Sequence, residues 1–311
     1  MITRRLFSEF LALKTSEVHR DAVHFLTQQY RWSYKEVYRH SGAYAVGLLE
    51  MGLKPGDTIS SWINCSEAAE SYMMHLACYR AGVKIITLGS GEDLDKALNG
   101  SKAFVLSPWI EYNGESRIDF LLKKVPQLLE TPAGSLVKSP VTAKYFIQTG
   151  FSTIRGTYKL KSIPVYNGKF TEVNTLSFTH KDSTIGDEEY KKFLGEVSGK
   201  VLNSGDIVVN SVTTKAPLSF ATFLAGLNNK TITASAIHDD PASIVNKQKA
   251  KVLVITEDKI ANIGGKCTVE KIVLGVNKKE DVDRVAKMLE GKGVKAKSLF
   301  PYHIGNLSYL G

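Results

Sequence analysis

Residues 32–88 alternate between helix and strand patterns, and this alternation is the feature that most constrains the fold of the chain. Ser33 and Glu36 form a capping-box pair, which predicts the start of a helix that ends near Gly52. The predicted elements that follow are a turn at 54–57, a strand at 58–63, a helix at 66–80 and a strand at 83–88. Helices alternating with strands predict a parallel sheet flanked by helices.

The same alternation continues to the end of the chain. It predicts helices at 93–98, 117–130, 188–194, 219–226, 241–248 and 279–290, and strands at 103–106, 145–148, 206–210, 231–234, 252–255, 271–274 and 295–299. Residues 131–175 are irregular and rich in proline, with a further short strand expected near 163–166. We therefore predict an α/β fold of two sub-lobes with mainly parallel sheets, residues 1–175 (131–175 being an irregular border) and residues 176–311.

Composition excludes some classes of protein. No apolar run reaches the roughly 18 to 20 residues that a membrane-spanning helix needs. Three widely spaced cysteines predict neither a zinc site nor a disulfide framework. The net charge of +9 is typical of ordinary solubility in a basic compartment, or of contact with nucleic acid or anionic lipid head groups.

The N-terminal sequence MITRRLFSEFLALK has two arginines, one acid and an amphipathic pattern. Such a pattern is typical of a mitochondrial presequence. Its apolar residues also suit the first packed helix of the fold. We expect either an uncleaved import signal that doubles as the first helix or a plain first helix.

Several short motifs resemble those of acyl-CoA synthetases, the AMP-binding or adenylate-forming enzymes. The motifs are WSYKEV (32–37), GLKPGDTI (52–59), NCSEAAE (64–70) and ACYRAGV (77–83), and segments 117–130, 219–241 and 250–260 follow in the family's order. The resemblance covers nearly the whole chain. It implies the fold of a truncated N-terminal domain of such an enzyme.

The family's phosphate loop reads approximately T-S-G-T-T-G-x-P-K-G, and its glycines let the backbone close on the nucleotide phosphates. In one register, residues 178–192 retain Thr179, whereas His180, Lys181 and Asp182 replace small residues and glycine. In a second register, residues 148–156 supply Arg155 in place of the lysine. Neither register keeps the full glycine pattern, so we expect the phosphate loop to be lost.

The family's magnesium-binding element reads approximately Y-G-x-T-E. The matching segment, 299–307, retains Tyr302 but has residues 304–306, Ile-Gly-Asn, where the Thr-Glu pair is expected. We expect the family's ribose-binding aspartate and its C-terminal domain with the catalytic lysine to have no counterpart here. We therefore expect no catalytic residue and no cofactor, with Thr179, His180, Lys181, Asp182 and Tyr302 as degenerate remnants.

No histidine has a metal-ligand spacing, so no metal site is predicted. His238-Asp239-Asp240 could hold a cation, but Asp240 before Pro241 is favoured as a helix N-cap.

These expectations together predict a non-catalytic, acyl-CoA-synthetase-like accessory subunit of a large mitochondrial assembly. The expected host is a membrane energy-converting complex, an ATP synthase or a respiratory complex, with the chain in the matrix or peripheral to the inner membrane. Its partners would be protein subunits, with contact to the membrane surface but no membrane span. The alternatives are a mitochondrial ribosomal protein in contact with nucleic acid, and a module or enzyme with residual nucleotide or acyl-CoA binding.

Overall fold

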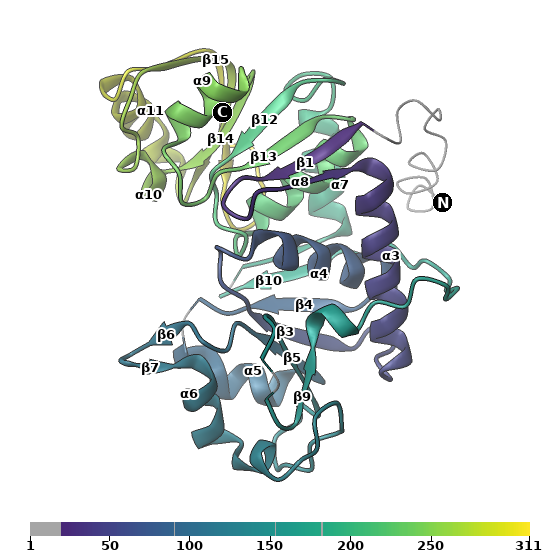
Figure 1. The fold of residues 1–311 in the computed structure, drawn as a ribbon. Coiled ribbons are helices and arrows are strands. Elements are labelled where there is room, and N and C mark those ends of the chain that lie inside the picture. Colours follow the sequence, from purple (N-terminus) through teal and green to yellow (C-terminus); the bar gives the residue numbers. More distant parts are fainter. Residues whose placement is uncertain (1–19, 90, 153, 182) are drawn as a thin grey trace. The chain divides into compact units, whose positions relative to one another are not determined.

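The computed structural model describes residues 20–89, 91–152, 154–181 and 183–311, which divide into two compact units (Figure 1). Unit 1 contains residues 20–37 and 183–311, and unit 2 contains the residues between them. The helix expected at the N-terminus and the side chain of Asp182 lie outside the described residues.

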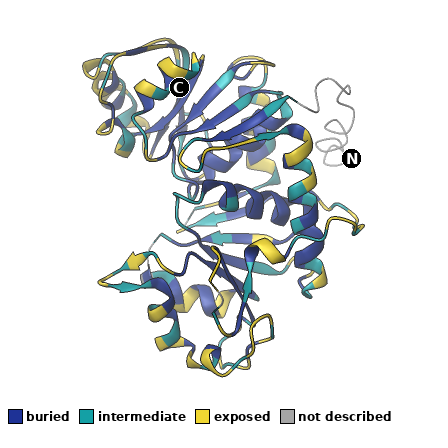
Figure 2. Cartoon of the chain, viewed as in Figure 1, coloured by how far each residue is buried: buried dark blue, intermediate teal, exposed yellow. Residues whose placement is uncertain are grey.

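Unit 2 is built on a parallel sheet with the strand order β10-β4-β3-β5-β8-β9. Its strands are β3 (Thr58–Trp62), β4 (Lys84–Thr87), β5 (Ala103–Leu106), β8 (Tyr145–Gln148), β9 (Thr157–Lys159) and β10 (Ser177–His180), and a hairpin of β6 (Glu111–Tyr112) and β7 (Glu115–Ser116) stands apart. Its helices are α3 (Tyr34–Glu50, which starts in unit 1), α4 (Ala68–Ala81), α5 (Leu94–Gly100) and α6 (Arg117–Lys124). Figure 2 shows the strands of this sheet as mostly buried.

Local signals set the ends of the first two helices as predicted. Before α3, the Ser33 N–H donates to Glu36 Oε2 at 2.7 Å, and the Glu36 N–H donates to Ser33 Oγ at 3.3 Å. This capping box satisfies two N–H groups that a helix start leaves without partners. α4 ends at Gly82, whose φ of +69° lies in the left-handed region that glycine adopts without strain.

Unit 1 is built on a second sheet with the strand order β16-β15-β14-β12-β13-β1-β2. The strands are β1 (Asp21–Phe25), β2 (Tyr30–Ser33), β12 (Ile207–Asn210), β13 (Ile232–Ser235), β14 (Val252–Thr256), β15 (Cys267–Val276) and β16 (Val294–His303). The helices are α7 (Asp187–Val197), α8 (Pro217–Asn228), α9 (Pro241–Gln248), α10 (Glu257–Ile260) and α11 (Val282–Gly291), and β11 (Ser183–Gly186) precedes α7. Among the described strands of this sheet, only β1 and β2 pair in antiparallel orientation.

The predicted α/β fold with mainly parallel sheets is confirmed, but the chain is grouped differently from the predicted lobes 1–175 and 176–311. Residues 20–37 join unit 1 because β1 pairs in parallel with β13, Val23 lying opposite Thr233. The β1–β2 hairpin was not predicted. None of the helices among the described residues is both long enough and apolar enough to cross a membrane.

Two predicted elements of unit 2 are wrong. The helix expected over 117–130 breaks after Lys124, because Pro126 has no N–H to continue it, and a 3-10 turn (Pro126–Leu129) follows. The strand expected near 163–166 is absent. This segment instead runs along α3, where the Val165 N–H donates to the Ala43 carbonyl at 2.9 Å.

Candidate functional site

A cluster of polar side chains lies at the carboxyl ends of three neighbouring strands of unit 2. Residues 64–67 follow β3, Ser107 directly follows β5, and Thr149 directly follows β8. The chain passes from β3 to β4 on one side of the sheet and then to β5 on the other, so the strand order reverses at β3. Open parallel sheets bind ligands at such a reversal, outside the carboxyl ends of the strands. This position makes the cluster the candidate functional site.

The carboxyl group of Glu67 is the centre of the cluster. The Thr149 hydroxyl donates to it, with Oγ1 2.9 Å from Oε1 and 2.8 Å from Oε2. The Ser107 hydroxyl donates to Oε2, and the Asn64 N–H donates to Ser107 Oγ at 2.8 Å. Ser107 and Thr149 are only 1% and 2% exposed. Both carboxyl oxygens are therefore held by hydroxyls that are out of contact with solvent.

A local turn positions Glu67. The Ser66 N–H donates to Asn64 Oδ1 and the Glu67 N–H donates to the Asn64 carbonyl, each at 3.0 Å. An asparagine side chain that accepts from the backbone two residues later closes such a turn. Glu67 then takes the N-cap position of α4, where the helix dipole favours a negative group.

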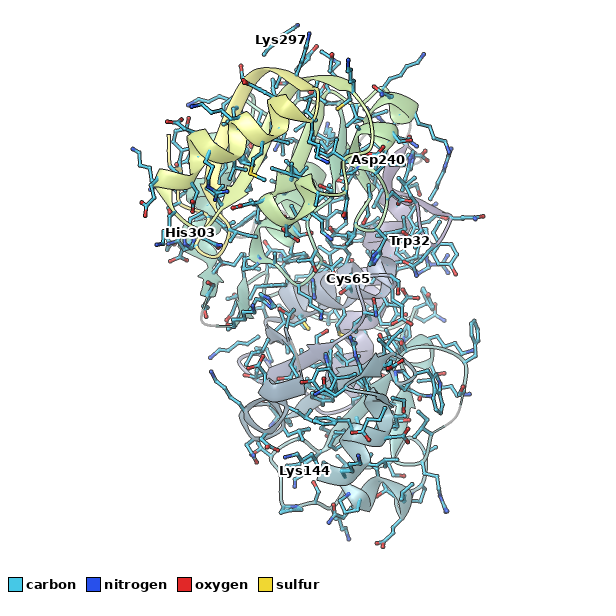
Figure 3. All side chains as sticks on the ribbon, turned by 90° about the vertical axis from the view of Figure 1, so that its left-hand side faces the viewer. Trp32, Cys65, Lys144, Asp240, Lys297 and His303 are labelled. Carbon is cyan, nitrogen blue, oxygen red and sulfur yellow. The ribbon has the colours of Figure 1, made fainter. Side chains whose placement is uncertain are left out.

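Arg117, the first residue of α6, brings a buried cation to the cluster. Its Nη1 donates to the Trp62 carbonyl at 2.5 Å, and its guanidinium carbon lies 4.8 Å from the centre of the Trp62 ring. Burial raises the pKa of Glu67 above its ordinary 4.5, although the two hydroxyls and the charge of Arg117 act in the opposite direction. Burial lowers the pKa of the Arg117 guanidinium. Cys65, labelled in Figure 3, is half-buried in the same turn.

Of the predicted remnants, Thr179 and His180 lie on β10 and not in a loop. The Thr87 hydroxyl donates to the Thr179 carbonyl at 3.2 Å and lies 3.0 Å from His180 Nδ1. Lys181 is exposed in the following turn, with a φ of +52°. The described residues of 178–192 thus form strands, a turn and the start of a helix.

Tyr302 belongs to unit 1, whereas Thr179, His180 and Lys181 belong to unit 2. It lies on β16, is 1% exposed and packs edge-on against Phe193 with ring centres 5.0 Å apart. Burial raises the pKa of its hydroxyl. Tyr302 therefore serves the core of unit 1.

The expectation of an N-cap at Asp240 is confirmed. Its Oδ1 accepts from the Ala242 N–H at 3.0 Å and from the Gly264 N–H at 3.1 Å (Figure 3 labels Asp240). Among the described residues, no group of three histidine, cysteine or acidic side chains is placed to hold a metal ion.

Sequence reasoning missed Glu67, Ser107, Thr149 and Arg117. A signal was present, because each of three predicted strands is followed at once by a polar residue: Asn64, Ser107 or Thr149. Parallel strands of one sheet end at the same edge. Arg117 had no such signal, since it comes to the cluster from a helix.

The protein family described as AMP-binding enzyme matches residues 13–105. The N-terminal part of this chain is therefore similar to AMP-binding enzymes. Among curated proteins, the chain is 24% identical over 199 residues to YngI of Bacillus subtilis, a proposed acyl-CoA synthetase, with 62% of this chain and 36% of that protein covered. The chain therefore spans little more than a third of the length of this relative.

Two solved structures with the same fold illustrate this similarity. The N-terminal domain of FACL13 from Mycobacterium tuberculosis matches with a TM-score of 0.67 at 9% identity, covering 97% of this chain and 75% of that one. Coronafacic acid ligase from Pectobacterium brasiliense matches with a TM-score of 0.66 at 13% identity, covering 97% and 60%. The chain thus has the fold of the N-terminal domain of adenylate-forming enzymes.

The loop of residues 149–156, which makes up most of the second phosphate-loop register, joins the parallel strands β8 and β9. Its glycines are Gly150 and Gly156, both with positive φ, and a Cβ at Gly156 would lie 2.7 Å from Leu128 Cδ2. Gly156 is therefore required by packing. The loop begins with Thr149, the hydroxyl donor to Glu67.

The raised pKa of Glu67 predicts a specific dependence of stability on pH. The folded state favours the protonated carboxyl. The contribution of Glu67 to the free energy of unfolding is therefore fully present below about pH 4.5 and is lost as the pH rises through the pKa of the folded state. Glutamine does not titrate, so the Glu67→Gln variant does not lose this stability as the pH rises. We expect the wild-type free energy of unfolding, relative to that of Glu67→Gln, to fall as the pH rises above about 4.5.

Urea unfolding at a series of pH values measures this difference. Glu130→Gln is the matched control, because it replaces a solvent-exposed carboxylate of the same unit. A difference between wild type and Glu67→Gln that stays constant or grows with pH would contradict the assignment.

Proposed function

We propose that this chain is a non-catalytic, acyl-CoA-synthetase-like accessory subunit of a large mitochondrial assembly. The observation that carries the non-catalytic part is the hydrogen bonding of Thr149 to Glu67 at the start of the loop that joins β8 and β9. The hydroxyl with which the loop begins is 2% exposed and already donates to a carboxyl group within the protein.

The chemistry of phosphate binding explains why this contact matters. A phosphate cradle needs free N–H and O–H donors and a positive potential. Here the Thr149 hydroxyl is already engaged, and the group that engages it is an acid. Once Glu67 ionises, it repels a polyphosphate placed beside it, and the repulsion is strong where water is excluded. The cluster therefore supports a structural role, tying together the carboxyl ends of three strands.

Isothermal titration of the full chain with ATP and magnesium tests the non-catalytic part. We expect no binding heat at millimolar nucleotide, and no pyrophosphate release when a fatty acid and coenzyme A are added. The Glu67→Gln variant removes the acidic charge but keeps the shape of the side chain, so it should bind ATP at least as well as the wild type. Micromolar binding of ATP by the wild type, with pyrophosphate release, would overturn the proposal.

An exposed sheet edge in unit 1 supports a protein partner. β2 is an edge strand, and no described strand pairs with its outer side. Tyr30 on β2 is 48% exposed and stacks on Trp32 with ring centres 6.3 Å apart (Figure 3 labels Trp32). Proteins ordinarily cover or block such an edge, and aromatic residues are enriched in protein interfaces.

The proposed host is a membrane energy-converting complex, either ATP synthase or a respiratory complex. The basic composition, with a pI near 9.2, supports a mitochondrial setting. Native-gel migration of the tagged chain from mitochondrial extracts, followed by identification of the co-migrating subunits, tests it. We expect a band far above 34.2 kDa that contains subunits of one such complex. A band of monomer size would refute the accessory role. Co-migration with ribosomal proteins would refute the proposed host and identify the mitochondrial ribosome as the host instead.

A further inference from the structure

Residues 131–171 carry cations and no acid. The segment contains Lys138, Lys144, Arg155, Lys159, Lys161 and Lys169 and lacks aspartate and glutamate, although the chain as a whole has 31 acids in 311 residues. Lys144 has a structural role, since its ammonium donates to the carbonyls of Ser139 and Val141 at 2.6 and 2.7 Å. Arg155 and Lys161 are exposed and Lys159 is half-buried. An uninterrupted positive charge of this kind is typical of surfaces that meet polyanions.

The cations lie at one edge of unit 2. β9, labelled in Figure 1, is the last strand of its sheet. Among the described strands it pairs only with β8. Lys159 ends β9, Lys161 follows it, and Arg155 precedes it by two residues. The short strand therefore brings these three charges to the sheet edge.

Large apolar side chains are exposed beside these cations. Phe151 is 81% exposed, and Lys161 Nζ lies 3.8 Å from the centre of its ring. Leu129 and Leu136 are each 53% exposed. The segment that bears them packs on β9, because the Gly134 N–H donates to the Thr157 carbonyl at 2.9 Å. Leu128, next to Leu129, touches Gly156.

A pocket of ≈ 590 Å³ opens at the same edge. Its walls are mainly apolar and include Met51, Leu136, Tyr158 and Ile163, and Lys159 stands among them. The pocket is of the size of small-ligand sites. The pocket places an apolar lining next to a cation, and an amphiphilic ligand requires both.

We propose that this surface (Leu129, Leu136, Phe151, Arg155, Lys159 and Lys161), called here the β9 surface, binds anionic phospholipid bilayers. The cations meet the phosphate head groups, and the exposed Phe151 and leucines enter the acyl boundary. Two carboxylates border the surface, Glu50 in the pocket and Glu130 beside Leu129, but the cations of 131–171 outnumber them.

A lipid surface fits these residues better than a nucleic acid does. Single-stranded nucleic acid is bound by aromatic side chains on which successive bases stack. The β9 surface exposes one phenylalanine and two aliphatic leucines, and leucine offers no face for stacking. The inference also stands apart from the accessory role, since either one can hold without the other.

Co-sedimentation of the full chain with vesicles tests the inference. We expect binding to phosphatidylcholine vesicles that contain about 30 mol % phosphatidylglycerol, and little binding to phosphatidylcholine alone. The Arg155→Gln/Lys161→Gln double variant should lower the partition coefficient roughly 30-fold, since each cation near an anionic surface contributes a factor of about five. The Phe151→Ser variant should lower it about tenfold or more through lost apolar burial.

The matched control is Lys295→Gln/Lys297→Gln on β16 of unit 1. Both lysines are exposed, and the double variant has the same net charge as the test variant (Figure 3 labels Lys297). It should bind vesicles as the wild type does. If both double variants lost vesicle binding equally, the effect would be due to net charge alone, and the proposal would be overturned. Binding to a uridine oligonucleotide with none to vesicles would overturn it in favour of a nucleic-acid surface.

Discussion

Replacing Arg80 with methionine is expected to lower the free energy of unfolding by about 3–5 kcal/mol. The Arg80 side chain is 2% exposed, and it donates to the Tyr38 carbonyl at 2.6 Å, to Ser41 Oγ at 2.9 Å and to the Glu172 carboxylate. Its guanidinium carbon lies 4.2 Å from the centre of the Tyr38 ring. Methionine keeps most of the apolar stem but leaves the largely buried carboxylate of Glu172 without its cation.

Urea unfolding of the variant measures this loss, and Arg284→Met is the matched control. Arg284 also forms a two-pronged ion pair, with Glu257 at 2.6 and 2.9 Å, but its side chain is 51% exposed. Solvent screens exposed ion pairs, so this control should unfold within error of the wild type. Equal losses in the two variants would show that burial does not strengthen the Arg80–Glu172 pair.

Replacing Gly47 with alanine is expected to destabilise unit 2 by about 3 kcal/mol, although alanine is the better helix former. Gly47 lies within α3, and a Cβ there would stand 1.9 Å from the Ile163 carbonyl oxygen. The obstacle is backbone, so no side-chain rotation relieves it. The segment around Ile163 must move away from α3, and the bond from the Val165 N–H to the Ala43 carbonyl is lost with it.

Gly195→Ala is the control for this prediction. Gly195 also lies within a helix, α7, but nothing lies within 4 Å of the Cβ position and the residue is exposed. Alanine there should stabilise the protein by about 0.5–1 kcal/mol through its helix propensity. Hydrogen exchange at Val165 gives a second readout, since faster exchange in Gly47→Ala alone is expected. Equal stability of the two variants would refute the close approach of residue 163 to α3.

Elements governed by neighbours in sequence were largely predictable. The strands 103–106 and 145–148 and the helix 241–248 have the predicted bounds. Buried strands appear as short apolar runs, and Asp240 with Pro241 marks a helix start by local hydrogen bonding and a fixed backbone angle. The motifs at 32–83 also carried the family resemblance, and the family match covers them.

The candidate site was only partly predictable. The residues that follow β3, β5 and β8 could have been grouped by topology. The contact of Glu67 with Thr149 could not, because the two residues are 82 positions apart and the contact depends on strand pairing and burial that the local sequence does not encode. The same limit applies to Arg117, whose guanidinium reaches the Trp62 carbonyl across 55 positions.

The sequence by itself determined much of the order of helices and strands, the α/β class and the resemblance of its N-terminal part to AMP-binding enzymes, because short-range apolar periods, capping residues and short motifs record these directly. The tertiary structure alone decided that residues 20–37 join the C-terminal unit, through the pairing of Val23 with Thr233. It also decided that Thr149 donates to a buried carboxyl group. Both are contacts between distant segments, and their free energy comes from burial and hydrogen bonds that exist only once the sheets have formed.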